Sequence, residues 1–288
     1  MYNSAHKLLE VCIEENITIC EATLRHEEKE NNLSRETIRE SYHKMYDVMK
    51  DASSKAINET VITMSGITGG NAKKLQDYMK SGKGISDSFA LEAMARAISV
   101  LEVNGAMGKI VATPTAGASG ILPAALTSMQ QKYDFTDEEI IDSMVTAAAI
   151  GGIVAMNATI SGAEGGCQAE TGAASAMAAA ALVELMGGSV NEALHAASFA
   201  IIHVLGLVCD PIGGLVEFPC ALRNASGVSN AIISADLALA GIESIVPFDE
   251  VVDALFEVGN ALPATLRETA LGGLAATKTG CTFCSGCR

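Results

Sequence analysis

The chain has 288 residues, of which 49% are hydrophobic and only 4% aromatic, and its formal net charge is −15. An acidic chain without a basic run is a poor match for nucleic acid or an anionic lipid surface, so we expect neither as a partner. The N-terminal residues carry charges where a secretory signal would have an apolar core, which predicts a cytoplasmic protein. In that compartment, clustered cysteines more often bind metal or perform redox chemistry than form disulfides.

The N-terminal segment, residues 1–60, is rich in charges of both signs and is predicted to form amphipathic helices that pack on the rest of the chain. Residues 31–34 are typical of a turn between two of these helices, with Ser34 as the N-cap of the second. Cys12 and Cys20 lie on an amphipathic helix, so we expect both to be buried as small apolar side chains.

Residues 61–280 are predicted to form one helical domain. Within it, residues 141–230 contain only eight charged residues, of which Arg223 alone is basic, so the helices of this stretch should be central to the fold. Three apolar stretches are rich in Ala and Gly and lack flanking Lys or Arg anchors, which favours tightly packed buried helices over membrane spans. They lie near residues 145–160, 172–187 and 194–208. Alternating strand patterns are nearly absent, so the predicted fold class is all-α, with Gly-rich loops between buried helices.

Local signals mark several helix boundaries. Thr-x-x-Glu at 136–139 and Ser-x-x-Glu at 189–192 are capping boxes, each of which should begin a helix. The second of these helices should run to about Leu205, because a Gly and then a Pro follow it. Pro263 should begin a short last helix that ends at the pair of glycines 272–273.

Three Gly-rich polar segments interrupt the apolar helices, at residues 65–71, 113–120 and 165–168. Gly lets the backbone approach a ligand closely, and N–H groups at a helix start bind carboxylate or phosphate. Each segment alone is also typical of an ordinary turn. None matches the nucleotide-binding patterns G-x-x-x-x-G-K-[ST] or G-x-G-x-x-G in a strand-to-helix setting, so nucleotide binding has no support.

Six of the eight cysteines lie outside the amphipathic N-terminal helices. Three are in the charge-poor stretch at positions 167, 209 and 220, and three end the chain at positions 281, 284 and 287. Three thiols suit neither paired disulfides nor a four-thiolate zinc site, but they can hold an iron–sulfur cluster that keeps one iron open to a substrate. Gly and Pro residues between Cys209 and Cys220 predict a rigid loop that turns both thiols inward.

Five segments occur in the order S-G-I-T-G-G, A-T-P-T-A-G-A-S-G-I-L-P, G-C-Q-A-E, C-D-P-I-G-G-L-V-E-F-P-C-x-x-R-N and L-G-G-L-A-A-T-K-T-G, over roughly residues 60–280. Together they resemble the iron–sulfur L-serine dehydratases, and specifically the alpha (catalytic) subunit of the two-subunit form. The resemblance implies an all-helical catalytic domain that converts L-serine to pyruvate and ammonia without pyridoxal phosphate. It also implies a 4Fe–4S cluster on Cys167, Cys209 and Cys220, and a beta (regulatory) subunit as partner in a hetero-oligomer.

In the chemistry that the resemblance implies, the open iron acts as a Lewis acid on the serine hydroxyl while a base removes the α-proton. Lys109, Lys278 and His203 are candidates for the base, as is a serine alkoxide. The substrate carboxylate needs hydrogen-bond donors, which the Gly-rich loops are expected to supply. The candidate substrate-binding residues are Ser65, Thr68, Gly69, Gly70, Asn104, Thr113, Thr115, Gly117, Ser119 and Arg223.

Four polar residues of the charge-poor stretch also have a structural interpretation. Arg223 could offset the negative charge of the cluster or bind carboxylate, or it could form a structural salt bridge. His203 could be a hydrogen-bonded core residue. Asp210 and Glu217 could orient cluster ligands, or simply form hydrogen bonds within their loop.

The last eight residues, 281–288, read C-T-F-C-S-G-C-R, which is similar to part of a bacterial ferredoxin motif but lacks its fourth Cys and following Pro. Some single-chain relatives in the resembled family end in a cysteine that can fold back onto the open iron. By analogy, Cys284 or Cys287 is predicted to cap that iron when substrate is absent. A reactive tail without this role is the alternative.

Two other functions compete with the dehydratase. A subunit without enzymatic activity, either an electron carrier or a zinc-binding protein, could use the C-terminal cysteines. A pyridoxal phosphate dehydratase is disfavoured, because that chemistry sits on an α/β fold with a Schiff-base lysine and strand patterns are missing here.

Overall fold

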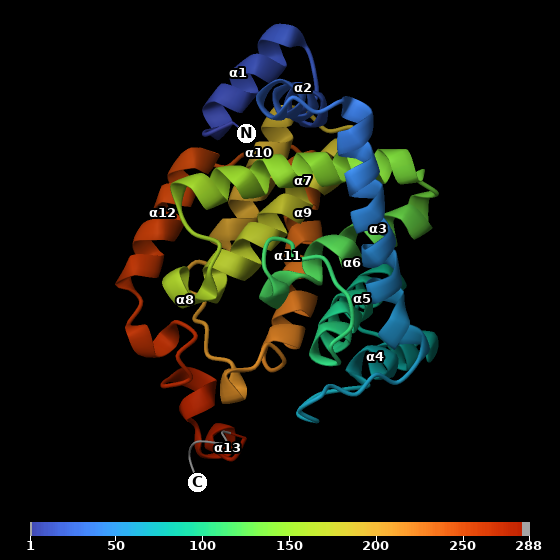
Figure 1. Ribbon diagram of the computed structural model, residues 1–288, viewed down its shortest axis with the longest axis vertical. Helices are drawn as coiled ribbons and strands as arrows, with labels where there is room; N and C mark the ends of the chain where they lie inside the picture. Colours follow the sequence, from blue (N-terminus) through green and yellow to red (C-terminus); the bar gives the residue numbers. More distant parts are fainter. Residues whose placement is uncertain (1, 284–288) are drawn as a thin grey trace.

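The computed structural model describes residues 2–283, and within them the chain consists of α-helices joined by turns and short 3-10 or π-helical segments (Figure 1). In that range, β pairing is limited to two isolated bridges, Ile62 with Gly69 and Cys209 with Arg267. The predicted all-α fold class is therefore confirmed. In chain order the α-helices are α1 (Ala5–Glu15), α2 (Ile19–Asn31), α3 (Arg35–Asn58), α4 (Asn71–Lys80), α5 (Ser88–Gly105), α6 (Ile121–Tyr133), α7 (Asp137–Asn157), α8 (Gly162–Gly165), α9 (Ala173–Leu185), α10 (Val190–Ile202), α11 (Cys220–Leu239), α12 (Phe248–Ala261) and α13 (Lys278–Cys281).

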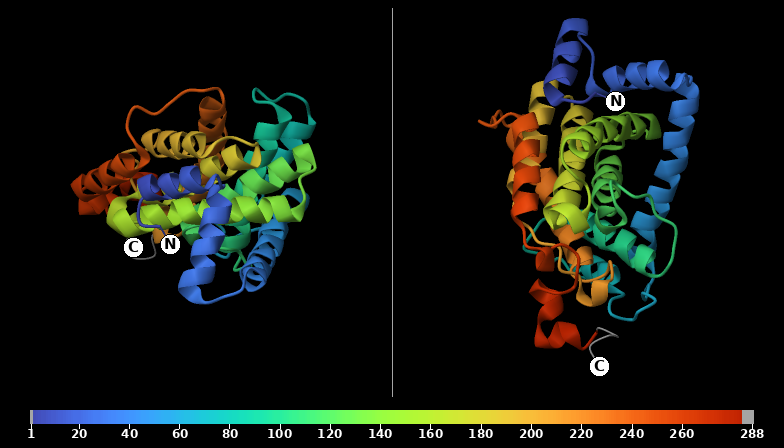
Figure 2. Two further views of the ribbon diagram at one scale, coloured as in Figure 1. Left: turned by 90° about the horizontal axis from the view of Figure 1, so that it is seen from above. Right: turned by 60° about the vertical axis from the view of Figure 1, so that its left-hand side comes forward.

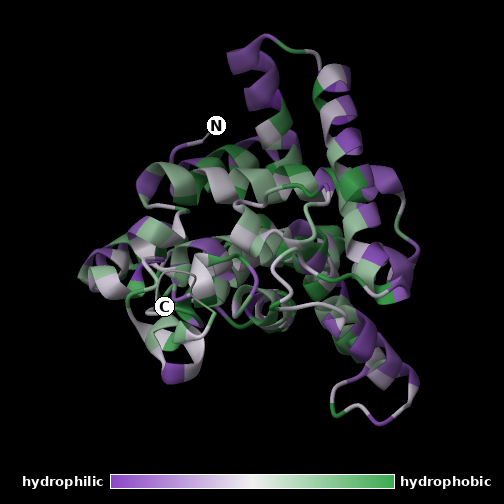
Figure 3. Ribbon diagram, turned by 60° about the horizontal axis from the view of Figure 1, so that its bottom comes forward, coloured by the Kyte–Doolittle hydropathy of each residue, from purple (hydrophilic) through white to green (hydrophobic). Residues whose placement is uncertain are grey.

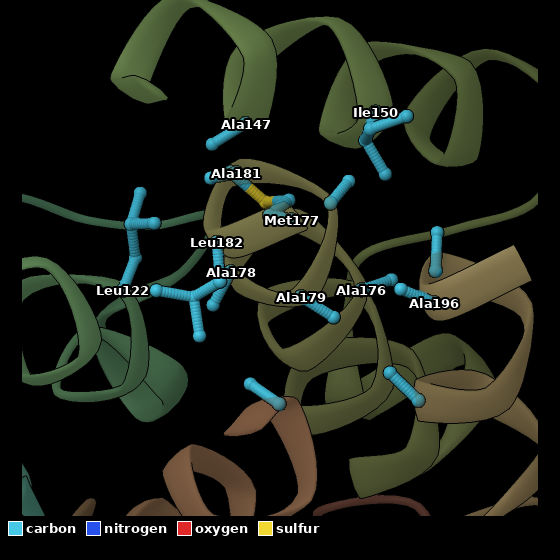
Figure 4. Packing of buried hydrophobic residues seen from close by; sticks show 14 of the residues in the cluster. Leu122, Ala147, Ile150, Ala176, Met177, Ala178, Ala179, Ala181, Leu182 and Ala196 are labelled. Atoms are coloured by element: carbon cyan, nitrogen blue, oxygen red, sulfur yellow. The ribbon is translucent and has the colours of Figure 1, made fainter. Parts of the chain in front are cut away.

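Helix α9 is the centre of the bundle and is apolar on nearly every face, because α6, α7, α10 and α11 surround it. Figure 4 shows Met177 of α9 pointing toward α7. The small side chains of Ala179, on α9, and Ala196, on α10, belong to the same cluster. The helices approach closely here, since a Cβ at Gly151 of α7 would lie 2.8 Å from Sδ of Met177. The low charge of residues 141–230 correctly predicted this central position.

Helices α1 and α2 cover one end of the bundle, and α3 runs along its flank (Figure 1, Figure 2). Their attachment is polar as well as apolar. The backbone N–H groups of Ile19 and Cys20, at the start of α2, donate to the Glu184 carboxylate of α9 at 2.8 and 3.1 Å. Asp249 of α12 accepts hydrogen bonds from the first turn of α1 in the same way. Cys20 and Cys12 are buried in apolar clusters, as predicted.

One helix, α7, is long and apolar enough to cross a membrane by length and composition. However, 67% of its apolar window is buried inside the structure, where α7 packs on α9 and α2. The core helix of a soluble protein has the same properties, in agreement with the prediction of buried helices. Hydrophilic residues gather instead on the outer helices, as the colours of Figure 3 show.

The predicted helix starts are confirmed. Ser34 caps α3, accepting the Thr37 N–H at 3.2 Å. The capping boxes at 136–139 and 189–192 begin α7 and α10, with both of the reciprocal hydrogen bonds present in each.

The predicted end of α10 is wrong by three residues. The helix ends at Ile202 rather than at Leu205, and turns follow it. Gly206 adopts a positive φ of 85°, and its N–H donates to the Gln168 side chain at 2.8 Å instead of continuing the helix. A contact with a segment distant in sequence therefore sets this boundary.

The predicted last helix, from Pro263 to about residue 271, is also wrong. Between α12 and the glycine pair 272–273 the chain makes a single 3-10 turn, Ala264–Leu266. The carbonyl at the end of this turn and the N–H of Glu268 pair with the backbone of Cys209, at 2.9 and 2.7 Å. A continuing helix would need those same two groups, so the pairing with Cys209 excludes it.

Ser189→Ala should lower the free energy of unfolding by about 1 kcal/mol, because it removes the side chain that accepts the Glu192 N–H at the start of α10. Denaturant unfolding followed by circular dichroism measures this loss. The matched control Ser41→Ala, inside α3, removes a hydroxyl that donates to the preceding turn. It should leave stability unchanged or slightly higher, so equal losses in the two variants would contradict the capping role.

Candidate active site

Three segments far apart in the sequence carry Cys167, Cys209 and Cys220 toward one end of the bundle, where α8, the start of α11 and the C-terminal segment lie (Figure 1). Cys167 lies between α8 and a π-helical turn, Cys209 follows α10 in an extended segment, and Cys220 begins α11. Their exposed fractions are only 4%, 3% and 7%, respectively. The thiol of Cys209 is hydrogen-bonded to that of Cys167, whose Sγ also lies 3.1 Å from Oγ1 of Thr171.

The contact between Cys167 and Cys209 shifts the pKa values of the two thiols in opposite directions. The hydrogen bond from Cys209 lowers the pKa of Cys167 to about 7 in spite of burial, and the charge of Arg223 acts in the same direction. The same hydrogen bond, together with burial, raises the pKa of Cys209. Burial raises the pKa of Cys220 to about 12. The Cys167 thiol therefore ionises most readily of the three, and metal binding would displace the protons that remain.

The three thiols are not placed to hold a single metal ion. A mononuclear zinc site needs sulfur ligands about 2.3 Å from one point. No group of three Cys, His, Asp or Glu side chains among residues 2–283 is placed to hold one ion. The irons of a cluster occupy separate corners, so its cysteine ligands need not converge on one point. Buried thiols beside a guanidinium have the chemistry that such an anionic cluster requires.

Arg223 forms the salt bridge that its structural interpretation predicted, since Nη2 donates to Oδ1 of Asp210 at 2.7 Å. Its positive charge also acts on Cys167, so the ion pair and the offset of negative charge at the thiols occur together. Asp210 in turn accepts the Leu274 N–H at 2.7 Å. Gly273 leaves no room for a side chain against this carboxylate. Asp210 thus connects Arg223 to the C-terminal segment.

The backbone around the first two cysteines is held from both sides. The N–H of Cys209 donates to the Leu266 carbonyl at 2.9 Å, and its carbonyl accepts the Glu268 N–H at 2.7 Å. The residue after Cys167 donates its N–H to the Leu207 carbonyl at 2.9 Å. The segments that carry Cys167 and Cys209 are therefore tied to their neighbours by main-chain hydrogen bonds.

Two buried carboxylates hold the first Gly-rich loop, residues 65–71. Glu217, from the loop between the second and third cysteines, accepts hydrogen bonds from the hydroxyls of Thr63 and Thr68 at 2.6 and 3.0 Å. Glu102 of α5 accepts the first backbone N–H of α4 at 2.6 Å, and burial raises the pKa of this carboxyl. Because the Thr68 hydroxyl donates to Glu217, it orients the loop and has no free hydrogen for a substrate.

Asn224 of α11 holds the second Gly-rich loop, residues 113–120. Its Oδ1 accepts the Gly120 N–H at 2.8 Å, and its Nδ2 donates to the carbonyl of Gly117 at 2.7 Å. The same Nδ2 also donates to the Cys220 carbonyl at 2.8 Å. One fully buried amide therefore fixes the loop against the segment that carries the third cysteine.

Glu170 lies between the second loop and the cysteines. The Thr115 hydroxyl donates to its Oε1 at 2.6 Å. A Cβ at Gly117 would lie 3.0 Å from Oε1, and a Cβ at Gly162 would lie 2.7 Å from Oε2 and 3.0 Å from Sγ of Cys209. Burial raises the pKa of this carboxyl. Glu170 thus places a carboxyl group close to Cys167 and Cys209, on the side of the site where the second Gly-rich loop lies.

The other predicted substrate-binding residues lie along the two loops, except Asn104, which is in the last turn of α5. Ser65 is exposed, Gly69 and Asn104 are half-buried, and Gly70, Thr113 and Ser119 are buried. Gly69 has a φ of 148°, and a Cβ there would lie 2.8 Å from the Val61 carbonyl oxygen, so this close approach requires glycine. Contact of these residues with a substrate stays a prediction.

The three candidates for the base lie apart from one another in the chain. Lys109 is exposed in the loop after α5, and Lys278 is exposed on α13. His203 is hydrogen-bonded, with Nδ1 2.6 Å from Oδ1 of Asn230, but it is exposed rather than in the core. Within residues 2–283, no hydrogen bond or ion pair joins any of the three to the cysteines described above. Their role as base stays a prediction.

The predicted Cys-rich tail is described only at its start. Cys281 is half-buried in α13, with Sγ 3.8 Å from the Ala275 carbonyl oxygen. Cys284 and Cys287 lie outside the described residues, and so does the cap that they were predicted to form over the open iron.

Three polar residues that shape the site, Glu102, Glu170 and Asn224, were not selected from the sequence. Glu102 is 1% and Asn224 0% exposed. Glu and Asn are mostly exposed in proteins, so their occurrence in an apolar helical stretch is a signal for a buried polar contact. The pattern did not show which backbone groups these side chains would bind.

The all-α fold thus gathers three buried thiols beside two firmly held Gly-rich loops. The chain belongs to the serine dehydratase alpha chain family, whose sequence model matches residues 14–275. It is therefore a subunit of an enzyme of the lyase class, and an alpha chain implies an enzyme of more than one subunit. The resemblance seen in the sequence is confirmed at the level of the family.

Three relatives illustrate the similarity. The chain is 54% identical over 280 residues to the L-serine dehydratase, alpha chain, of Peptoniphilus asaccharolyticus, covering 97% of this chain and 96% of that one. It is 47% identical over 280 residues to the probable L-serine dehydratase, alpha chain, of Bacillus subtilis, covering 97% and 93%. It is 36% identical over 293 residues to the L-serine dehydratase of Mycobacterium bovis, covering 95% of this chain but 61% of that one.

Proposed function

We propose that this chain is the catalytic alpha subunit of an L-serine dehydratase, which converts L-serine to pyruvate and ammonia. The observation that supports this most strongly is the placement of Cys167, Cys209 and Cys220 as buried thiols, in a member of the serine dehydratase alpha chain family. The names of the relatives support L-serine as the substrate. A non-enzymatic electron carrier or zinc protein gains no support from the family.

We further propose that Cys167, Cys209 and Cys220 hold a 4Fe–4S cluster. When bound, a cluster on three cysteines supplies an open iron that acts as a Lewis acid on the serine hydroxyl, so pyridoxal phosphate is not needed. Arg223 offsets negative charge beside Cys167, and Asp210 holds the guanidinium in position.

The two Gly-rich loops are the proposed site for the serine carboxylate. The hydroxyls of Thr68 and Thr115 already donate to Glu217 and Glu170. We therefore assign the binding of the carboxylate to backbone N–H groups of these loops rather than to the two hydroxyls. Glu217 and Asn224 set the position of the loops relative to the cysteines.

Removal of the α-proton requires an acceptor. Lys109, Lys278 and His203 stay candidates, and Glu170 joins them because its charge acts on both Cys167 and Cys209. Its Oε2 and Sγ of Cys209 both border the backbone of Gly162. A proton accepted at Oε2 of Glu170 would therefore lie next to the proposed cluster ligands.

We propose that activity requires a beta subunit, in a hetero-oligomer of the cytoplasm. This chain covers almost all of the relatives named alpha chain but only 61% of the Mycobacterium bovis L-serine dehydratase. That relative therefore has further sequence outside the matched part, and the relatives named alpha chain support a second kind of subunit. The six cysteines in the described part of the chain are all free, as expected for a reducing compartment.

The test is an anaerobic assay of pyruvate and ammonia from L-serine, with the chain alone and with its partner. We expect equal amounts of the two products from the complex and little from the chain alone. No product from the complex would overturn the proposed reaction, and full activity of the chain alone would overturn the need for the partner.

Glu217→Gln should raise KM for L-serine by about tenfold without reducing iron content, because residues that support a site indirectly typically contribute about 10–100-fold. Both hydroxyls donate to the same oxygen, Oε2, and a neutral amide oxygen is a weaker acceptor than a carboxylate oxygen, so glutamine should hold Thr63 and Thr68 less firmly. Steady-state kinetics measures the change. The control Glu59→Gln alters an exposed carboxylate at the C-cap of α3, and an unchanged KM in both variants would contradict the role of Glu217.

A further inference from the structure

Arg267 differs from the other arginines of the described chain in its partners. Residues 2–283 contain six arginines. Five form salt bridges with Asp or Glu: Arg25, Arg35, Arg39, Arg96 and Arg223. Arg267 has no carboxylate partner in this range; its Nη1 donates to the Glu164 carbonyl at 3.2 Å. Its Nε is buried and has no hydrogen-bond partner.

A buried donor without a partner is unfavourable, and more so on a charged side chain. In a chain whose net charge is −15, an arginine without a carboxylate partner is also unusual. Native proteins rarely keep such a group unless a water, an ion or a ligand satisfies it. Arg267, which is half-buried, therefore keeps hydrogen-bonding capacity that the described residues do not use.

A cavity of about 340 Å³ lies beside Arg267, between the end of α7, α8, α12 and the C-terminal segment. Its lining includes Arg267, Thr159, Glu164, Asn260, Thr269 and Phe256. The volume is at the small end of the range for ligand sites, so a small molecule fits it best. Phe256 and neighbouring alanines offer apolar contact, while Asn260 brings an amide group.

We propose that this cavity is a second binding site, separate from the cysteine site, for a small carboxylate held by Arg267. A guanidinium can donate to the two oxygens of a carboxylate through a planar pair of N–H groups, and Arg267 brings this group to the lining of the cavity. Two sources share this chemistry. A simple carboxylic acid would use Arg267 alone, whereas an α-amino acid would also place its ammonium near the exposed Glu164 carboxylate.

The main chain connects this cavity to the cysteine site. The two sequence neighbours of Arg267 pair with the backbone of Cys209. On the other side of the cavity, Gly165 lies two residues before Cys167. Gly259 of α12 packs directly on it, since a Cβ at Gly259 would lie 2.9 Å from the Cα of Gly165. A bound carboxylate would therefore hold together the segments that carry Cys167 and Cys209, which makes the cavity a site of regulation.

This inference goes beyond the proposed dehydratase activity, and its test does not depend on turnover. The full chain is labelled with ¹⁵N-arginine, and the Nε–H resonance of Arg267 is identified by its loss in Arg267→Gln. Sodium acetate and L-alanine are titrated at constant ionic strength, with sodium chloride as the reference. We expect a saturable shift of the Arg267 resonance with either carboxylate and no shift for Arg25, which is exposed and already paired.

Equilibrium dialysis with labelled acetate measures the affinity independently. Arg267→Gln should weaken binding at this site at least tenfold, and Ala163→Leu should do so by filling the cavity from α8. Arg25→Gln is the matched control and should change nothing. Stronger binding of L-alanine than of acetate, lost in Glu164→Gln, would identify an amino acid as the ligand, and equal binding would identify a carboxylic acid.

The proposal is overturned if the Arg267 resonance responds to chloride as it does to acetate. It is also overturned if both Arg267→Gln and Ala163→Leu leave the affinity unchanged. Neither result would bear on the proposed dehydratase reaction, because neither measurement involves L-serine or the three cysteines.

Discussion

Replacing Cys167, Cys209 or Cys220 with Ser should reduce pyruvate formation from L-serine by more than about a hundredfold. Residues that only support a metal ligand typically contribute about 10–100-fold, and loss of a ligand itself should exceed this. Serine keeps the volume of the side chain but replaces a soft thiolate with a hydroxyl that stays protonated and binds iron poorly. Bound iron should fall together with activity.

The matched control for these three variants is Cys12→Ser. Cys12 is also buried, at 2% exposure, but it lies on α1 at the opposite end of the bundle from the site (Figure 1). It should retain iron and activity even if stability falls. Thermal melting shows whether each variant is folded. Full iron content and activity in a variant of any of the inner three cysteines would contradict its assignment as a ligand.

Asn224→Ala should combine a large loss of stability with weaker binding of L-serine. It leaves the N–H of Gly120 and the carbonyl of Gly117 without their partner, and unsatisfied buried groups cost about 1–3 kcal/mol each. We expect the free energy of unfolding to fall by about 2–4 kcal/mol and Tm by roughly 5–15 °C. KM should rise because the loop is no longer fixed against the segment of Cys220.

Asn58→Ala is the matched control, because Asn58 is exposed at the end of α3 and donates only within its own helix. Its effect should stay within about 0.5 kcal/mol. Thermal melting and steady-state kinetics of the two variants measure both effects. A lower Tm with an unchanged KM in Asn224→Ala would contradict a role for this residue in positioning the loop.

The features of the fold that could be predicted from the sequence depend on local signals. Ser34 and the two capping boxes mark helix starts because their hydrogen bonds lie within four residues. The low charge of residues 141–230 predicted the buried centre, because charged side chains are almost never fully buried without a partner. Both signals can be used without knowing which distant residues are in contact.

The errors occur where a distant contact overrides a local signal. Pro263 is a plausible helix start, but the following backbone pairs with Cys209, some sixty residues earlier in the chain. The end of α10 depends in the same way on Gln168. Neither pairing leaves a pattern near the residues that it affects.

The candidate site shows the same limit. Gly and Pro around Cys167, Cys209 and Cys220 distinguished these three from the packing cysteines, and the family resemblance implied that all three are cluster ligands, which stays a prediction. The polar contacts that hold the loops could not be foreseen, because Glu170 and Asn224 bind groups 55 and 104 residues away in sequence. Only the folded structure shows that these carboxyl and amide groups face the loops.

Analysis of iron and sulfide in an anaerobic preparation tests the central claim most directly. We predict about four irons and four sulfides per chain, with a broad absorption at about 400 nm that air bleaches. The Cys167→Ser variant, prepared in the same way, should have lost both iron and sulfide. Zinc in place of iron, or iron that remains bound after all three inner cysteines are replaced, would contradict a cluster on Cys167, Cys209 and Cys220.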